Sequence, residues 1–236
     1  RTSELGYFTV YVQSNFTGNN GGYGMKLKQA YVQLEYVTAG LARSSFDDPA
    51  SPPTIDAQGP CGEVSSKNVL IQYAPVLSDR WRMAVSVENP SASYTCIPEM
   101  SEPISQRCPD IPAYVQYNPD KDSHIRVSGI FRQLSYRDML SGRNRFVTGW
   151  GMQLSGQALV GHGFTFYYSA AYGKGIAHYV NDLGGQGLDL IHSGNAGELK
   201  APGTFVFTSG LQYDFSSRFF VSASYSQCRL YGQKSL

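Results

Sequence analysis

The chain has 236 residues, of which 17 are tyrosine, 12 phenylalanine and 25 glycine, while only 16% are charged. This balance favours strands and turns over helices, and the length suits one all-β domain. The net charge of +1 provides no global field that would attract nucleic acid, so no nucleic-acid partner is predicted. No apolar run reaches the 18 residues that a transmembrane helix requires.

In chain order, the alternation of apolar and polar residues predicts about eleven strands. They are Gly6–Thr17, Tyr23–Leu34, Val37–Arg43, Asn68–Ala74, Trp81–Glu88, Ala113–Tyr117, His124–Tyr136, Phe146–Leu159, Phe164–Lys174, Thr204–Tyr213 and Phe219–Tyr231. Single-chain bacterial barrels have an even number of strands, so an odd number predicts either an incomplete chain or a strand that the alternation misses.

The two faces of the predicted strands differ in an informative way. In the strand His124–Tyr136, Ile125, Val127 and Phe131 alternate with His124, Arg126, Ser128 and Arg132. The polar faces carry Ser, Gln, Gly and Arg, and the apolar faces are rich in aromatic residues. This pattern is typical of a transmembrane antiparallel β-barrel, with apolar side chains toward lipid and polar ones toward a wet lumen. A soluble β-sandwich that acts as a binding module is the alternative.

The predicted connections alternate between short and long. Residues 35–36, 75–80, 118–123, 160–163 and 214–218 form short joins, whereas 43–67, 89–111 and 175–203 form long ones, with a medium one at 137–145. A membrane barrel with short periplasmic turns and long external loops has this alternation. The 43–67 connection carries acids and prolines, and we expect it to fold into the barrel and narrow the pore.

The four cysteines are Cys61, Cys96, Cys108 and Cys228. Cys96 and Cys108 lie in one polar, proline-bearing segment, and they either form a disulfide in an oxidising compartment or remain free thiols. The sequence alone gives no partner for Cys61 or Cys228.

Catalytic and metal-binding patterns are weak. None of the four histidines stands in a recognisable nucleophile motif. The spacing of His178 and His192 matches no zinc motif. The sequence therefore predicts no enzyme, no metal site and no cofactor.

The first third of the chain contains "MKLKQAYVQLEYVTAGLARSSFDDPASPPTIDAQGP" and a later strand that ends in "VENP". With these segments it resembles the DcaP-like family of outer-membrane porins. The matching positions are Lys26, Lys28, Ala30, Tyr31, Val32, Ser44, Phe46, Asp48, Pro53, Asp56, Gly59, Pro60, Glu88 and Pro90. The chain departs from the family at Ala42 and Arg43, where the family tends to have Thr-Trp, and in having four cysteines.

The resemblance implies a homotrimer of barrels in the bacterial outer membrane, each with 16 strands when complete. The barrel would contact outer-membrane lipid and lipopolysaccharide. It would transport small anionic solutes such as dicarboxylates by passive diffusion. We therefore expect residues 1–236 to form a single barrel domain that is incomplete at both ends. A plugged or receptor-like outer-membrane barrel remains an alternative.

Selectivity in such a pore depends on the charges around its narrowest part. The predicted basic pore-lining residues are Lys26, Lys28, Arg43, Arg82, Arg126 and Arg132. The predicted acidic residues of the pore loop are Asp47, Asp48, Asp56 and Glu88. We expect Asp47, Asp48 and Asp56 to face the basic wall, because unpaired charge is costly where water is scarce.

Overall fold

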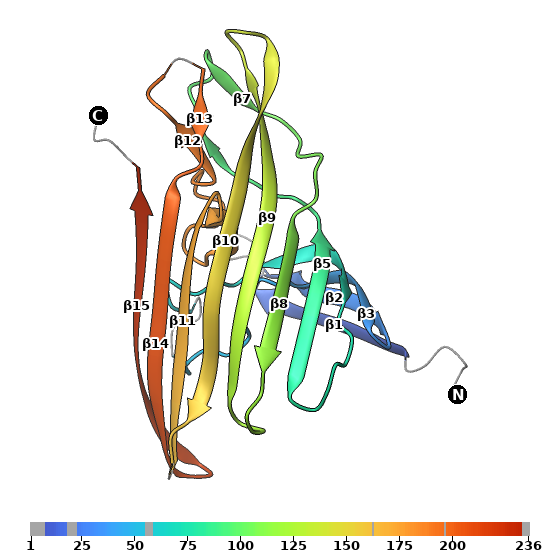
Figure 1. Ribbon diagram of the computed structural model, residues 1–236, viewed down its shortest axis with the longest axis vertical. Coiled ribbons are helices and arrows are strands. Elements are labelled where there is room, and N and C mark those ends of the chain that lie inside the picture. The colour runs from blue at the N-terminus through green and yellow to red at the C-terminus, as the bar shows by residue number, and fades with distance from the viewer. Residues whose placement is uncertain (1–7, 18–22, 55–58, 162, 196, 233–236) are drawn as a thin grey trace.

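The structure is a computed structural model that describes residues 8–17, 23–54, 59–161, 163–195 and 197–232. Eleven strands follow one another in a single antiparallel sheet, each paired with its neighbour (Figure 1). They are β1 (Phe8–Thr17), β2 (Tyr23–Leu34), β3 (Val37–Arg43), β4 (Lys67–Tyr73), β5 (Trp81–Glu88), β8 (Ile111–Tyr117), β9 (His124–Asp138), β10 (Arg143–Leu159), β11 (Phe164–Lys174), β14 (Gly203–Ser216) and β15 (Phe219–Tyr231). The eleven predicted strands are therefore confirmed.

The sheet curves but does not close, since no pairing among the described residues joins β1 to β15. Four short strands and a 3₁₀ turn lie within the long connections. These are β6 (Tyr94–Thr95), β7 (Ser101–Pro103), η2 (Ala177–Tyr179), β12 (Leu190–His192) and β13 (Leu199–Lys200). No helix in the described ranges is long and apolar enough to cross a membrane.

The β9–β10 hairpin extends further than the alternation predicts. Pairing continues to Asp138 opposite Arg143, which leaves only residues 139–142 for the turn. The end of the hairpin is polar on both faces, so the apolar alternation stops before the backbone pairing does. The short strand β7 pairs with this extension, opposite residues 136–138 of β9.

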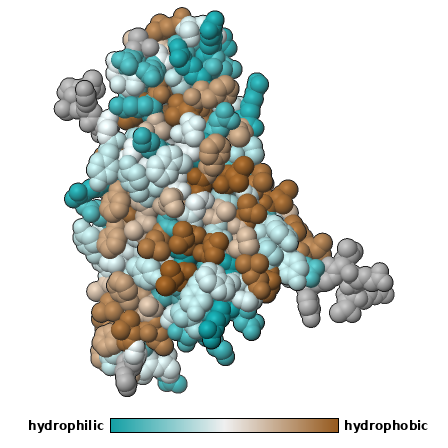
Figure 2. All heavy atoms as spheres, in the orientation of Figure 1, coloured by the Kyte–Doolittle hydropathy of each residue, from teal (hydrophilic) through white to brown (hydrophobic). Residues whose placement is uncertain are grey.

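The outer face of the sheet is apolar, as the alternation predicts. On β9 and β10 the side chains of Ile125, Val127, Phe131, Trp150, Met152 and Leu154 are exposed, whereas Arg126, Ser128, Arg132, Gln153 and Ser155 are buried. Figure 2 shows brown hydrophobic residues over the middle and the lower left of the molecule, and teal residues toward its upper and lower ends. A soluble β-sandwich buries its apolar faces between two sheets, so the exposed apolar face contradicts the sandwich alternative. It agrees with a sheet whose outer face contacts lipid.

The long connections fold back against the inner face, which we define as the face that carries Arg126, Ser128 and Arg132. Residues 44–66 and 175–189 meet there in one hydrophobic cluster, whose members include Phe46, Val64, Ile176, Tyr179 and Val180. Phe46 and Tyr179 pack edge to face, with ring centroids 5.8 Å apart. The core of this part of the molecule thus lies inside the curved sheet, between the wall and two inward loops.

A glycine in the wall allows this close packing. A Cβ at Gly151 of β10 would lie 2.9 Å from Ile176 and 3.2 Å from Phe46, well inside ordinary contact distance. The absence of a side chain at Gly151 therefore lets Phe46 of the 44–66 segment and Ile176 of the 175–189 segment pack against the sheet at the same position.

Candidate functional site

The inner faces of β2, β3, β4, β8 and β9 and the inward 44–66 segment line a water-accessible hollow of about 300 Å³. Its lining is mainly neutral and polar, with two arginines and one aspartate: Gln29, Tyr31, Gln33, Thr38, Ala42, Arg43, Ser44, Asp47, Pro49, Gln72, Tyr114 and Arg126. The hollow lies where the predicted pore-constricting connection meets the wall, so it is the candidate narrow part of a passage.

Five charged or titratable side chains line or support this hollow, and we call them the lumen cluster: Arg43, Asp47, Asp48, His124 and Arg126. Arg43 lies at the end of β3 and forms an ion pair with Asp47, with 2.8 Å between Nη1 and Oδ2. The Arg43 side chain is 40% exposed, whereas that of Asp47 is 0% exposed. The cation therefore reaches water while its partner anion does not.

Arg126 of β9 supports the segment from the opposite side. Its Nη1 donates to the backbone oxygen of Asp47 and its Nε donates to Oε1 of Gln116, both at 2.8 Å. The guanidinium also lies 3.9 Å from the ring centroid of Tyr114. Arg126 is buried, so it holds the loop in place and offers little of its charge directly to the lumen.

Asp48 attaches the segment to β9 and β10. It accepts a hydrogen bond from the Ser155 hydroxyl at 2.6 Å and lies 3.1 Å from Nε2 of His124. Burial raises the pKa of Asp48, but the His124 hydrogen bond, the Arg126 charge and the Ser155 hydroxyl outweigh it and hold the pKa below its usual value. Asp48 is therefore an ionised anchor at neutral pH.

Asp47 behaves differently, although it is the next residue. Burial raises its pKa to about 7, and the nearby Arg43 only partly opposes this effect. Its second carboxylate oxygen, Oδ1, is buried and has no hydrogen-bond partner in the described part of the chain. Such an oxygen tolerates a proton well, so Asp47 titrates close to neutral pH beside an exposed arginine.

Three other predicted basic residues lie apart from this cluster. Lys26 and Lys28 of β2 share a groove with Leu41, Ser65, Ser66 and Lys67. Lys28 stands at a register shift, because Ser14 of β1 pairs with Leu27 and Gln13 pairs with Gln29. Arg82 is exposed on β5, opposite Gln116. The structure therefore does not gather the predicted basic residues on one wall.

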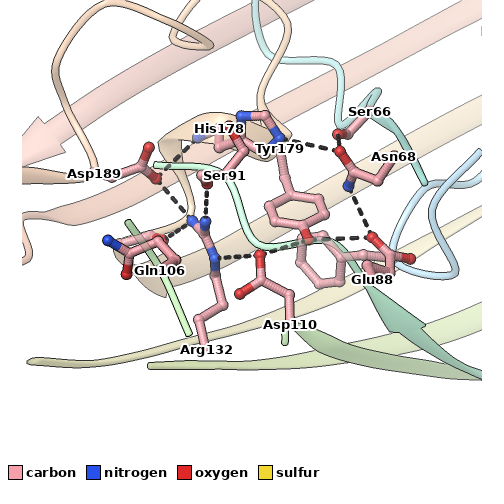
Figure 3. A network of polar contacts seen from close by, with 12 residues as sticks. Ser66, Asn68, Glu88, Ser91, Gln106, Asp110, Arg132, His178, Tyr179 and Asp189 are labelled. Atoms are coloured by element: carbon pink, nitrogen blue, oxygen red, sulfur yellow. Dashed lines mark hydrogen bonds and ion pairs between the residues drawn. The ribbon is translucent and has the colours of Figure 1, made fainter. Parts of the chain in front are cut away.

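Arg132 and Glu88 are corrections to the predicted lining. Their residues are 0% and 1% exposed, respectively, and both lie in a group that we call the buried network: Asn68, Glu88, Asp110, Arg132, His178, Tyr179 and Asp189 (Figure 3). Loop residues cover both side chains, because the 89–110 and 175–202 connections fold inward over them. Asp56 lies outside the described residues.

In the buried network, Arg132 is the central cation. It forms ion pairs with Asp110 at 2.9 Å and Asp189 at 2.8 Å, and it donates to the backbone oxygens of Ser91 and Gly175. These partners come from both long external connections. Arg132 of the wall thus ties two loops together (Figure 3).

Tyr179 connects this centre to the 44–66 segment. Its hydroxyl donates to Oδ2 of Asp110 at 2.9 Å and lies 3.2 Å from Oε2 of Glu88. Glu88 in turn accepts from the backbone N–H of Ser45 at 3.1 Å and from Asn68 at 2.8 Å. The hydrogen bonds therefore run without a break from the external loops to the pore loop.

Asp110 has a raised pKa of about 6 because burial outweighs the attraction of Arg132. His178 has a lowered pKa, because burial and the Arg132 charge disfavour its charged form. The buried network is therefore largely desolvated, and its remaining charges depend on Arg132 as their partner.

Sequence reasoning missed several residues of these two groups. Asp110, His178, Tyr179 and Asp189 were not predicted as site residues, since they lie in or beside long connections whose folding the alternation does not report. Asn68 and His124 were also not predicted, nor was Gln116, which supports Arg126. A signal existed for these three, because each is a polar residue of a predicted strand.

All four cysteines are free thiols, so Cys96 and Cys108 are not joined in the structure. Cys96 packs instead against the hydrophobic cluster that contains Leu134 and Tyr136. No group of three or more potential metal ligands occurs in the ranges that the structure describes.

The curved sheet, apolar outer face and inward polar loops define the class of an outer-membrane β-barrel channel. The family model described as "Porin subfamily" matches residues 1–229, so the chain belongs to this porin family and is located in the bacterial outer membrane. No curated protein matches the sequence.

Two solved structures align with the chain to different degrees. The outer-membrane channel DcaP of Acinetobacter baumannii aligns with a TM-score of 0.79 and 14% identity, over 94% of this chain and 62% of that one. OmpT of Vibrio cholerae aligns with a TM-score of 0.43 and 10% identity, over 87% of this chain and 70% of that one. The chain thus spans about three fifths of the length of DcaP, and the similarity to DcaP supports the barrel fold.

Proposed function

We propose that the protein forms a water-filled channel through which small hydrophilic solutes diffuse, with a preference for anions such as dicarboxylates. The observation that carries this proposal is the partial exposure of Arg43 at the inward loop, beside a partner whose carboxylate is buried and titrates near neutral pH. A passing anion meets the guanidinium before it meets the acid. Arg43 therefore biases the local potential toward anions.

Three further cations support this preference. Lys26 and Arg82 are exposed, and Lys28 is half-buried. Among the ion pairs of the described residues, none involves these three side chains, so their charges are not neutralised by direct contact. The predicted basic lining is thus reduced to Lys26, Lys28, Arg43 and Arg82, with Arg126 as a support for the loop.

The proposal also covers the assembly and the absence of catalysis. We infer a homotrimer surrounded by outer-membrane lipid and lipopolysaccharide, as expected for a porin of this fold. In both the lumen cluster and the buried network, the charged side chains mainly bind the loops to the wall. We therefore assign the protein a transport role and no enzymatic role.

Reversal potential in a planar bilayer tests the proposal. The full-length protein is reconstituted under a salt gradient, with and without a dicarboxylate as competitor. We expect a reversal potential of the sign that anion preference gives, and a reduced chloride current when the dicarboxylate is added. A cation preference would contradict the proposed role of Arg43, Lys26 and Arg82.

A plugged barrel is the second candidate. The observation that favours it is the hydrophobic cluster between the two inward loops and the wall, which fills part of the space inside the sheet. A protein that inserts into the bilayer but conducts no ions under voltage would support this second function and rule out open diffusion.

A further inference from the structure

The far end of the 44–66 segment is fastened to the inner face of β14 and β15. The backbone N–H of Gly62 donates to Oγ of Ser226 at 2.7 Å, and the Ser222 hydroxyl donates to the backbone oxygen of Pro53 at 2.8 Å. A Cβ at Gly62 would lie only 2.5 Å from the backbone oxygen of Gln227. The segment therefore crosses from β3 to the opposite end of the sheet and meets it at close range.

Cys61 stands at this contact. It lies in the turn 60–63, which is closed by a hydrogen bond from Glu63 N to Pro60 O at 3.0 Å. Its thiol is 3.5 Å from Oγ of Ser226. Cys61 therefore points at the inner face of β15.

Cys228 lies two residues after Ser226 on the same strand and hence on the same face. Its register partner is Val206, which is fully buried, and its side chain packs against the inner hydrophobic cluster. Side chains two positions apart on one face of a strand are separated by about 7 Å. Because the Cys61 thiol contacts Ser226, Cys228 lies one same-face position further along β15 from that contact.

We propose that Cys61 and Cys228 are the site of a disulfide that covalently fastens the inward 44–66 segment to strand β15. The structure has the reduced form, with both thiols free. Cys96 is not a competitor, because it packs in a different cluster, against Leu134 and Tyr136. The cell envelope outside the cytoplasm is an oxidising compartment, where such a bond persists.

The bond forms by thiol–disulfide exchange with a protein disulfide oxidant of the envelope. One cysteine thiolate attacks a sulfur of the oxidant and forms a mixed disulfide, and the second thiolate then displaces the oxidant. The two cysteines lose two electrons and two protons, and the oxidant leaves as a dithiol. A disulfide requires the two Cβ atoms to lie about 4 Å apart, so the 60–63 turn has to bring Cys61 to that separation from Cys228.

Peptide mapping tests the proposal directly, because trypsin separates all four cysteines. The expected peptides are 44–67 with Cys61, 83–107 with Cys96, 108–121 with Cys108 and 219–229 with Cys228. The folded, full-length protein in detergent is treated with diamide, its remaining thiols are alkylated, and the digest is analysed by mass spectrometry without reduction. We expect a species with the summed mass of peptides 44–67 and 219–229 less two hydrogens, which disappears after reduction.

A matched variant tests whether the pairing depends on the face of β15. Gln227→Cys combined with Cys228→Ser moves the thiol by one residue, to the opposite face of the same strand. We expect at least a tenfold loss of the cross-linked species in this variant, while Cys96→Ser combined with Cys108→Ser keeps it at the wild-type level. Full alkylation of Cys61 and Cys228 after oxidation of the wild type, or equal cross-linking in the shifted variant, would overturn the proposal. Because the readout is chemical, it does not depend on whether the channel conducts.

Discussion

The lumen cluster and the buried network use the same residue types but have different tasks. Both pair arginine with aspartate at about 2.8 Å, and both join a loop to the wall. In the lumen cluster, Arg43 reaches water, so its charge acts on passing solutes. In the buried network, Arg132 is fully enclosed, so its charge acts only on the loops around it. Access to water thus separates a selectivity group from a structural one.

The largest expected effect comes from removing the central cation of the buried network. Arg132→Met leaves Asp110 and Asp189 buried without their partner, and we expect a loss of about 3–5 kcal/mol in the free energy of unfolding. Denaturant or thermal unfolding of the full-length protein in detergent measures it. Arg82→Met, on the exposed part of the wall, is the control and should change stability by about 0.5 kcal/mol or less. Equal effects of the two substitutions would abolish the distinction between the clusters.

A smaller effect is expected where the two regions meet. Phe46→Leu removes the edge-to-face contact with Tyr179 but keeps the site apolar, so we expect a loss of about 1–2 kcal/mol. The control, Phe131→Leu on the outer face, should have less effect, because that side chain makes fewer protein contacts. Conductance noise gives a second readout, since a looser 44–66 segment should fluctuate more. An unchanged unfolding midpoint for Phe46→Leu would show that the hydrophobic cluster around Phe46 and Tyr179 does not hold the 44–66 segment against the wall.

Charge removal in the lumen cluster should change selectivity and cost less stability than Arg132→Met, because Asp47, with a pKa of about 7, can take up a proton when Arg43 is lost. A unit charge about 8 Å from a passing ion in water contributes about 0.5 kcal/mol, with opposite sign for an anion and a cation, which corresponds to about a sixfold change in the anion-to-cation permeability ratio. We expect Arg43→Gln to lower the anion-to-cation permeability ratio by this factor, as measured from the reversal potential. Lys121→Gln, in the short 118–123 turn, is the matched control. A larger shift for Lys121→Gln than for Arg43→Gln would place the selective charges elsewhere.

The smallest expected effect is a pH dependence of the same ratio. Asp47 has a pKa of about 7, so it is mostly neutral at pH 6 and mostly ionised at pH 8. At pH 6 Arg43 has no opposing charge, and anion preference should be higher; at pH 8 the ion pair forms, and the preference should fall by less than about sixfold. Asp47→Asn should keep the high value at both pH values. A wild-type ratio that rises with pH would contradict this assignment.

Much of the fold could be predicted from the sequence. The side chains of a strand alternate between its faces with a period of two, so residues such as Ile125 and Val127 reveal an outer face that contacts lipid. Connection lengths then separate the two ends of the barrel. The site was predicted only in part: Arg43, Asp47 and Asp48 come together, whereas Arg132 and Glu88 are buried away from the lumen.

The failures have one physical cause. Alternation shows which face of a strand a residue occupies, but not whether another segment covers that face. Arg126 and Arg132 share the polar face of β9, and nothing local to β9 predicts that residues 47, 110 and 189 will bind them. For the same reason, alternation could not predict that Cys61 and Cys228 lie near each other, since they are 167 positions apart in the chain.

The sequence by itself determined the class of the sheet, the orientation of its faces and the position of the inward loop, because these follow from local periodicity and composition. Only the tertiary structure decided which charges remain in contact with water, which aspartate titrates near neutral pH and which cysteines are neighbours. These properties depend on long-range packing and desolvation. Folding brings the loops onto the wall, and their burial, rather than the identity of any single residue, sets the role of each charge.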